Sequence, residues 1–298
     1  MPKDKSKDGV QPIPESELIL NPDGSVYHLS LRPQDISDTI VTVGDPGRVH
    51  LVSGHFDSVD FEMNKREFIT HTGTYKGKRL TVISTGMGTD NIEILMNELD
   101  ALVNINLKTR VPKKQQTSLN IIRVGTSGSL QQDLPLGGML ASEYGIGLDT
   151  LMCFYDLPQS ETEAAVGAGI QKALDLPFTP YVVRGSDALL QRLAGDMRKG
   201  NTVTCPGFYA PQGRVLRLPN PRPKFIDELN GFHHEDFWLT NFEMETAGYY
   251  ALGRLLGHEV LSLNALIANR ITHEFAKNPH HVVDQLIVTL LDRLVATA

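Results

Sequence analysis

The sequence predicts an α/β protein: one domain of three layers, α/β/α, built around a central, twisted, mixed and largely parallel sheet. Three observations support this prediction. Short β-branched runs alternate with longer helical patterns from Ile40 onward, the order expected for a largely parallel sheet. Several of these runs end in glycine, at the strand ends where such sheets bind ligands. The length of 298 residues, 41% of them hydrophobic, allows a large core.

The predicted elements follow one another without an internal repeat or an interdomain linker. Strands are expected at Ile40–Val43, Arg79–Ser84, Asn120–Val124, Gly138–Ala141, Tyr181–Val183, Asn201–Thr204 and Val260–Ala268. Helices are expected at Gly47–Gly54, Asp90–Leu107, Glu161–Ala173, Ala188–Met197, Glu245–Leu256 and His280–Ala298. We therefore expect one domain over residues 25–298. Residues 1–24 begin with a run rich in Lys, Asp, Pro and Ser and are predicted to be a mobile tail.

Composition excludes several classes of protein. The net charge is −7, which argues against a nucleic-acid-binding surface. The two cysteines, Cys153 and Cys205, are far apart and fit neither a disulfide framework nor a zinc pattern, so a reducing cytoplasm is expected. No apolar run resembles a signal peptide or is long enough to cross a bilayer. The basic run at residues 108–116 is predicted to be an exposed loop insertion rather than a binding patch.

Three arginines stand near turns or strand ends that can accommodate an anion. Gly44-Asp45-Pro46-Gly47-Arg48 follows an apolar strand and opens a helix, which offers backbone N–H groups to an anion. Arg123 lies inside an otherwise apolar strand and needs a partner there. Thr126, in the turn expected after that strand, and Arg66 add further donors. Together these groups suit a phosphate dianion, whereas each arginine taken alone is better explained as a surface or salt-bridge residue.

A carboxylate pair, Glu243 and Glu245, flanks Met244 at the start of a predicted helix. Ionised carboxylates are poor core material without partners. They are good acceptors for the hydroxyl groups of a sugar. The alternative is that the pair serves only the helix dipole, and the motif alone does not decide between them.

The segment from Phe208 to Arg214 combines aromatic side chains with Gln212 and a guanidinium. A flat heterocycle can stack on Phe208 while Gln212 and Arg214 bind its edge. Glutamine offers a donor and an acceptor side by side, which matches the N3–H and carbonyl pattern of uracil. The alternative is a Pro/Gly loop whose polar residues have no joint role.

Other motifs fail on spacing. Residues 86–91 lack the third glycine of a dinucleotide fingerprint, and no Walker lysine follows a glycine loop. Residues 125–129 lack the last glycine of a nucleophile elbow, which disfavours an esterase using Ser127 or Ser129. His258-Glu259 and His273-Glu274 lack the second histidine of a zincin. For residues 233–236 a solvated loop is favoured over a metal site.

The ordered series of motifs resembles the nucleoside phosphorylase family, most closely its uridine phosphorylase branch. The resemblance runs from about Tyr27 to the C-terminal helix. It rests on Tyr27-His28-Leu29, Gly44-Asp45-Pro46-x-Arg48, Arg66-Glu67-Phe68, Ser84-Thr85-Gly86-Met87-Gly88, Arg123-x-Gly125-Thr126, Phe208-Tyr209-x-x-Gln212-x-Arg214, Glu243-Met244-Glu245 and Asn269-Arg270. It implies a nucleoside phosphorylase-like catalytic domain over residues 25–298.

The resemblance also implies a role for each matching residue. Phosphate would be bound by Gly44, Arg48, Arg123 and Thr126 of one subunit and by Arg66 of its neighbour. Ribose would contact Thr126, Glu243, Met244 and Glu245, with His28 of the neighbour at the 5′-hydroxyl. The base would contact Phe208, Gln212, Arg214 and Arg270. The residues implied to act in catalysis are Arg123, Glu245, Gln212, Arg214 and Arg270.

The implied reaction is phosphorolysis of uridine, and of deoxyuridine, to uracil and a pentose 1-phosphate in pyrimidine salvage. Inorganic phosphate would be the co-substrate, and no cofactor is expected. The enzyme would be a cytoplasmic homo-oligomer built from dimers with shared active sites. A monovalent cation near Glu67 is a further expectation, although Asn91 stands where the family places a serine.

Two alternatives stay open at this point. One is a nucleoside phosphorylase with purine or broad specificity, although purine-specific relatives are not expected to carry the Phe208-to-Arg214 pattern. The other is a non-catalytic nucleoside-binding protein on the same fold. The presence of Glu245 and three arginines argues against it, because folding alone requires none of them.

Overall fold

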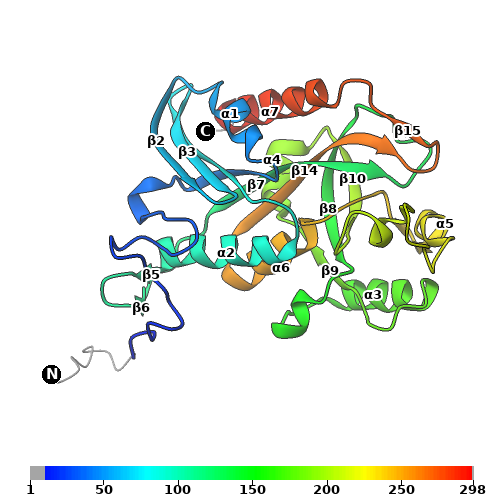
Figure 1. The fold of residues 1–298 in the computed structure, drawn as a ribbon, viewed down its shortest axis with the longest axis horizontal. Helices are drawn as coiled ribbons and strands as arrows, with labels where there is room; N and C mark the ends of the chain where they lie inside the picture. The colour runs from blue at the N-terminus through cyan, green and yellow to red at the C-terminus, as the bar shows by residue number, and fades with distance from the viewer. Residues whose placement is uncertain (1–10, 297–298) are drawn as a thin grey trace.

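A mixed β-sheet forms the centre of the molecule, with helices packed on both faces (Figure 1). The computed structural model describes residues 11–296. The strands of the main sheet are β1 (Thr39–Val43), β2 (Ser58–Lys65), β3 (Phe68–Tyr75), β4 (Lys78–Ser84), β7 (Asn120–Ser129), β8 (Met139–Gly147), β9 (Tyr181–Arg184), β10 (Arg198–Thr204), β13 (Asn241–Glu243), β14 (Glu259–Asn269) and β15 (Glu274–Phe275). Two small hairpins lie apart from it: β5 (Ile105–Asn106) with β6 (Val111–Pro112), and β11 (His233–His234) with β12 (Phe237–Trp238).

The helices fill two layers and one end of the sheet. They are α1 (Gly47–Ser53), α2 (Thr89–Asn104), α3 (Glu161–Ala173), α4 (Asp187–Ala194), α5 (Phe225–Gly231), α6 (Thr246–Leu256) and α7 (Pro279–Ala296). One buried cluster joins α1, α4 and α7 to the sheet, and a second joins α2 and α6 to it. A third cluster holds α3 and α5 at the end formed by β8 and β10 (Figure 1). The predicted three-layer α/β class is confirmed.

The sheet is parallel at its centre and closes partly on itself. Parallel pairs join β4 to β1, β1 to β7, β7 to β14, and β8 to β10 to β13. Antiparallel pairs join β13 to β7 and β14 to β8, so β7, β14, β8, β10 and β13 form a ring. This closure was not predicted, because it depends on β13, whose three residues are too few to leave a sequence pattern.

Two further differences concern the expected elements. The hairpin of β2 and β3 was missed, although residues 59–64 alternate apolar and polar side chains as an exposed strand does. The turn expected after Val124 is absent, because β7 continues through Ser129 with β14 and β13 as its neighbours. Thr126 and Ser127 are therefore strand residues, held by ladder hydrogen bonds rather than by a loop.

The N-terminal region differs in part from the expected tail of residues 1–24. Residues 1–10 lie outside the described residues. From Ile13 onward the chain is attached to the body: the Ile13 amide donates to the Arg110 carbonyl at 2.8 Å, and Leu20 pairs with Val26. The Asn21 side chain donates to the Val26 carbonyl at 2.8 Å. Within residues 11–296, no helix combines the length and apolar character needed to cross a bilayer.

Candidate active site

A cavity of about 500 Å³ opens beyond the carboxyl ends of β1 and β4, beside residues 123–128 of β7 and the end of β13. Its size lies within the range of small-molecule sites, and its position is the one that parallel sheets give to ligands. Many of the predicted site residues line it: Gly44, Arg48, Arg123, Thr126, Phe208, Gln212, Arg214, Glu243, Met244 and Glu245. Segments more than 200 residues apart therefore meet in one place.

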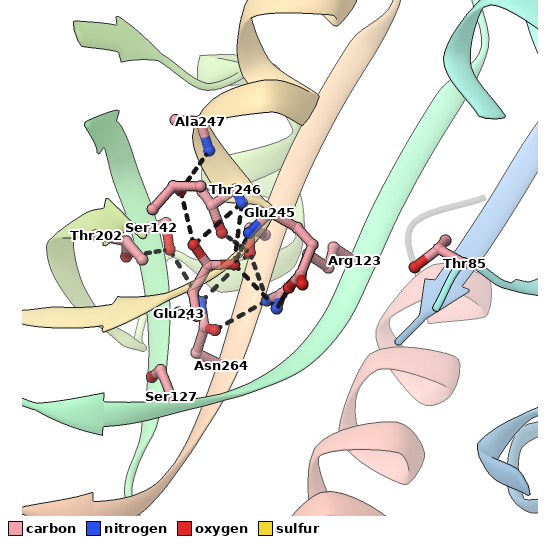
Figure 2. A network of polar contacts seen from close by, with 12 residues as sticks. Thr85, Arg123, Ser127, Ser142, Thr202, Glu243, Glu245, Thr246, Ala247 and Asn264 are labelled. Atoms are coloured by element: carbon pink, nitrogen blue, oxygen red, sulfur yellow. Dashed lines mark hydrogen bonds and ion pairs between the residues drawn. The ribbon is translucent and has the colours of Figure 1, made fainter. Parts of the chain in front are cut away.

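Arg123 is the buried cation of this cavity, 5% exposed. Its Nη2 makes ion pairs with Glu245 Oε2 at 2.6 Å and with Glu243 Oε2 at 2.9 Å (Figure 2). Its Nη1 donates to Asn264 Oδ1 at 3.0 Å. Burial disfavours the cation, but the two carboxylates outweigh this effect and raise the pKa of Arg123. The prediction that an arginine in this strand requires a partner is confirmed.

Gly125 gives Arg123 the space for this position. A Cβ atom at residue 125 would lie 1.9 Å from Arg123 Nη1 and 2.3 Å from its Cζ. The guanidinium therefore folds back over the backbone of its own strand. Glycine is required here for close approach, and its φ is not in the left-handed region.

Glu243 is committed to protein groups. Its carboxylate accepts from the backbone N–H groups of Glu245 at 2.9 Å and Thr246 at 2.9 Å, which caps the N-terminus of α6. It also accepts from the Thr204 hydroxyl at 2.7 Å. With the Arg123 ion pair, both of its oxygens are occupied. This matches the alternative that a carboxylate here serves the helix terminus, and the ribose contact expected for Glu243 stays a prediction.

Glu245 has a different environment although it is only two residues away. Its Oε2 faces Arg123, and its Oε1 accepts from the Gly88 N–H at 2.9 Å, at the N-terminus of α2. Burial raises the pKa of Glu245, Arg123 opposes this, and the charge of Glu243 adds to the rise. Because it lines the cavity with fewer protein partners than Glu243, it retains acceptor capacity for a ligand hydroxyl.

Arg48 is the second cation at this end of the cavity. Its guanidinium makes no hydrogen bond or ion pair with any residue in the described range 11–296, and burial lowers the pKa of Arg48. The helix N-terminus that precedes it is less open than predicted, because Asp45 Oδ1 accepts from the Gly47 N–H at 2.9 Å. The guanidinium, rather than the α1 terminus, is therefore the group that awaits an anion.

The other end of the cavity is formed by the loop after β10. The Arg214 guanidinium lies over the Phe208 ring, with its Cζ 3.7 Å from the ring centroid. Its Nη1 donates to the Phe208 carbonyl at 2.7 Å and to Gln212 Oε1 at 2.5 Å. We predicted that a heterocycle would stack on Phe208, and here a guanidinium covers one face of that ring.

Gln212 and Arg270 complete the loop end. The Gln212 side chain is buried, and the backbone carbonyl of Gln212 accepts from Arg270 Nη1 at 2.8 Å. Arg270 and Arg214 have no carboxylate within ion-pair distance among residues 11–296, and both lie near the Phe242 ring. Burial, and then the charge of Arg270, lower the pKa of Arg214 to about 10. Two cations without carboxylate partners favour a ligand that carries or develops negative charge.

Three predicted residues do not line the cavity: Arg270, which contacts the lining residue Gln212, and Arg66 and His28, which lie next to each other near Tyr27. The Arg66 guanidinium is 6.0 Å from the Tyr27 ring centroid, and Tyr27 contacts the His28 ring edge to face at 4.8 Å between centroids. Arg66 occupies the turn between β2 and β3 with a φ of 54°, a conformation that residues other than glycine rarely adopt. Its neighbour Glu67 does line the cavity. The patch of Tyr27, His28 and Arg66 is thus next to the cavity but turned away from it.

The expected cation near Glu67 stays a prediction. Glu67 and the Asn91 amide both approach Gly86, within 3.4 Å of where its Cβ would lie. The described residues contain no group of three or more His, Cys, Asp or Glu side chains placed to hold a metal ion, and this includes residues 233–236.

Sequence analysis missed several groups that complete the site. Asn264 and Ser262 on β14 contact Arg123, and Thr204 on β10 contacts Glu243. The signal was weak: Ser262 and Asn264 interrupt the otherwise apolar run of β14, and Thr204 ends a mostly polar β10. The serines considered for an esterase bond elsewhere: Ser127 Oγ accepts from Asn241 and Ser129 Oγ donates to the Gln131 carbonyl.

The cavity of this α/β fold thus brings together arginines, which suit an anion, and a carboxylate pair, which suits hydroxyl groups. The family model of the phosphorylase superfamily matches residues 38–297. The chain therefore belongs to the phosphorylase superfamily, and it is an enzyme of the pentosyltransferase class.

Individual relatives and solved structures agree with this assignment. The chain is 28% identical to a uridine phosphorylase of Thermococcus kodakarensis over 86% of this chain and 81% of that protein. It is 27% identical to a DeoD-type purine nucleoside phosphorylase of Streptococcus suis over 83% of this chain and 88% of that protein. A Trypanosoma brucei nucleoside phosphorylase, described as showing uridine phosphorylase activity, superposes with a TM-score of 0.85 at 26% identity, covering 94% of this chain and all of that one.

Proposed function

We propose that this protein catalyses the phosphorolysis of uridine, and of deoxyuridine, to uracil and the pentose 1-phosphate. The observation that carries the proposal is the arrangement of one cavity: Arg123 and the unpaired Arg48 at one end, Glu245 beside them, and Gln212 with two arginines at the other. We call the end with Arg48 and Arg123 the inner end, and its two cations suit phosphate. The Glu245 carboxylate suits ribose hydroxyls, and the Gln212 amide with the guanidinium groups suits the carbonyls of uracil.

In this mechanism the C1′–N1 bond breaks and its electron pair stays on the base. A phosphate oxygen then forms the new bond to C1′, and the uracil anion takes a proton. No protein nucleophile is needed, because the site orients the two substrates and stabilises charge. Arg48, Arg123, Thr126 and Gly44 are assigned to phosphate, and Met244 and Glu245 to ribose. Gln212, Arg214 and Arg270 are assigned to the uracil carbonyls.

Glu243 acts through other groups in this proposal. Its oxygens cap α6 and hold Arg123, so it orients Glu245 and the guanidinium rather than contacting ribose. Phe208 presents a ring to the base once Arg214 turns its guanidinium from the ring face toward the uracil edge. Such a movement requires only side-chain torsions, because Arg214 is held there by neutral groups.

A spectrophotometric uridine assay with and without phosphate tests the function. We expect uridine to be consumed with phosphate or arsenate, and not in a buffer free of both. Full activity without phosphate contradicts the proposal and points to hydrolysis, for which the cations are not needed. Uridine binding without turnover in either buffer points to the non-catalytic alternative.

Purine or broad specificity is the second candidate function, because the matched relatives include purine nucleoside phosphorylases. A panel of nucleosides at fixed phosphate separates the two. We expect uridine to react faster than inosine, because the loop that carries Gln212 and Arg214 matches the uracil edge. Faster turnover of inosine contradicts the base assignment and leaves the phosphate assignment intact.

We also propose that the enzyme is a cytoplasmic homo-oligomer built from dimers, and that it serves pyrimidine salvage. The support for a shared site is the patch of Tyr27, His28 and Arg66. The family resemblance assigns His28 and Arg66 to the active site, yet both lie outside the cavity of their own subunit. Tyr27 is 39% exposed and Met87, at the cavity edge, is 71% exposed. A twofold contact would place Arg66 and His28 of one subunit in the cavity of the other.

Mixing two inactive variants tests the shared site. Arg66→Ala and Arg123→Ala are co-expressed with different tags, and the doubly tagged species is purified. In a mixed dimer one site carries both changes and the other carries neither, so activity returns. Continued inactivity of a stable mixed oligomer contradicts the sharing of residues between subunits.

A further inference from the structure

One carboxylate, Glu98 on α2, holds both the ring and the backbone of the His28 segment. Glu98 Oε1 lies 2.6 Å from His28 Nδ1. The two oxygens also accept from the backbone N–H groups of His28, at 2.9 and 3.0 Å, and of Leu29, at 2.9 Å. These contacts join residues about 70 positions apart, so they come from tertiary structure alone.

This arrangement determines which nitrogen of His28 carries the proton. Both Glu98 oxygens accept hydrogen bonds from backbone N–H groups, so this carboxylate acts as an acceptor. His28 Nδ1 must therefore carry a proton and donate it to Glu98 Oε1. A neutral imidazole with a proton on Nδ1 has an unprotonated Nε2. Nε2 makes no hydrogen bond within residues 11–296, and the His28 side chain is 29% exposed. The ring therefore offers one acceptor to the outside of its own subunit.

The surroundings of the ring limit how it can turn. Tyr27 packs edge to face against it at 4.8 Å, and the Arg66 guanidinium is next to Tyr27. Glu98 is only 16% exposed, so water competes weakly for its oxygens. The ring is thus held by packing on one side and by a charge-assisted hydrogen bond on the other.

We propose that Glu98 is a positioning residue that fixes His28 in the Nδ1–H form, so that Nε2 accepts a hydrogen bond from the 5′-hydroxyl of a nucleoside in the neighbouring subunit. This rests on the function and the shared site proposed above. It defines a substrate class: nucleosides whose 5′ carbon carries a hydrogen-bond donor. Nucleosides without that donor lose the contact and gain nothing in exchange.

Glutamine at residue 98 cannot reproduce the contacts of glutamate. Three N–H groups point at two acceptor oxygens, and an amide has only one oxygen. If that oxygen stays on the backbone N–H groups, the amide NH2 faces Nδ1 and the ring must carry its proton on Nε2. The donor and acceptor ends of the ring are then exchanged, with almost no change in shape.

Kinetics with two substrates test the proposal. Uridine and 5′-deoxyuridine are compared at saturating phosphate in the wild type, in Glu98→Gln and in Glu98→Ala. We expect the wild type to prefer uridine by about threefold to tenfold in kcat/KM, the range of one hydrogen bond. In Glu98→Ala this preference falls toward one, through the loss of activity on uridine alone, because the ring is no longer held. In Glu98→Gln it falls less, because the 5′-hydroxyl can turn and accept from Nε2–H. Glu93→Gln, on the same helix but bonded to Tyr155 and Asn97, is the control and keeps the preference.

A purely structural role for Glu98 gives a different result. It lowers kcat/KM equally for both substrates and lowers the melting temperature, and this outcome overturns the proposal. Equal rates of the wild type on the two substrates also overturn it. If the wild type cleaves no nucleoside at all, the proposed function has failed, and the wild-type assay alone reveals this.

The tautomer is measured independently of activity by nitrogen-15 NMR of the histidine rings. The signal of His28 is identified by its loss in His28→Ala. We expect a protonated Nδ1 and an unprotonated Nε2 in the wild type, and the reverse in Glu98→Gln. A protonated Nε2 in the wild type contradicts the proposal whatever the kinetics show.

Discussion

The two ends of the cavity are built in different ways. At the inner end, the side chains of Arg123, Glu243 and Glu245 are buried, and Arg123 forms an ion pair with each glutamate. At the loop end, Arg214 and Arg270 are half exposed and bind only neutral groups. The inner end is therefore part of what holds the fold together, whereas the loop end can change with little effect on the fold.

This difference explains why substrate choice is harder to infer than reaction type. A buried charge cluster is costly to alter, because each group left without its partner destabilises the protein. A surface loop held by neutral hydrogen bonds carries no such penalty. Uridine and purine nucleoside phosphorylases both match this chain at similar identity, so these matches alone do not fix the base.

The largest effect is expected for Arg123→Met. Loss of the cation removes charge stabilisation worth about 10²–10³ in rate. It also leaves Glu243 and Glu245 as unpaired buried carboxylates, which lowers the free energy of unfolding by about 3–5 kcal/mol. Phosphate-dependent kinetics and denaturant unfolding measure both. The control is Arg198→Met, whose partner is Asp133 at the surface, where an ion pair contributes about 0–1 kcal/mol. Equal stability of the two variants contradicts the comparison.

Arg214→Ala should separate activity from stability. We expect kcat/KM for uridine to fall by about 10²–10³, because the donor to the departing base is lost. The free energy of unfolding should change by no more than about 1 kcal/mol, because only neutral hydrogen bonds disappear. Arg217→Ala, on the exposed part of the same loop, is the control. Unchanged turnover would remove Arg214 from the proposed site.

Gly125→Ala tests how tightly the inner end is packed. The new methyl group must displace the Arg123 guanidinium, which lies 1.9 Å from its position. Overpacking of this kind costs about 1–3 kcal/mol, and we expect a raised KM for phosphate together with a lower melting temperature. Gly231→Ala is the control, because no atom lies within 4 Å of its Cβ position. A normal KM for phosphate in Gly125→Ala would show that the guanidinium can move freely.

The smallest effect concerns pH and the ribose contact. Burial raises the pKa of Glu245 above 4.5, so below that pKa the carboxyl is protonated and accepts poorly. Uridine affinity without phosphate should therefore rise with pH through this range, by about tenfold. Because the folded protein binds this proton more tightly than the unfolded chain, the contribution of Glu245 to stability falls over the same range as pH rises. Calorimetric titrations from pH 4 upward, with Glu245→Gln as control, measure the binding, and a flat profile contradicts the ribose assignment.

The sequence determined the fold class and many of the residues that line the cavity. Strand–helix alternation requires a mainly parallel sheet, and such a sheet brings residues near the carboxyl ends of its strands together. Arg123 was found because an arginine in an apolar strand is conspicuous, and Glu243 and Glu245 because they start a helix. These are local signals, so they are visible without knowledge of distant contacts.

Only the tertiary structure decided which partner each site residue has. Glu243 and Glu245 are two residues apart with the same side chain, and both line the cavity. They nevertheless have different partners, because Thr204 from β10 donates to Glu243 and Gly88 at the start of α2 donates to Glu245. Two other contacts also join distant segments: β13 pairs with β7 and closes the sheet, and Glu98 binds His28. Long-range packing sets these contacts, and no local pattern records them.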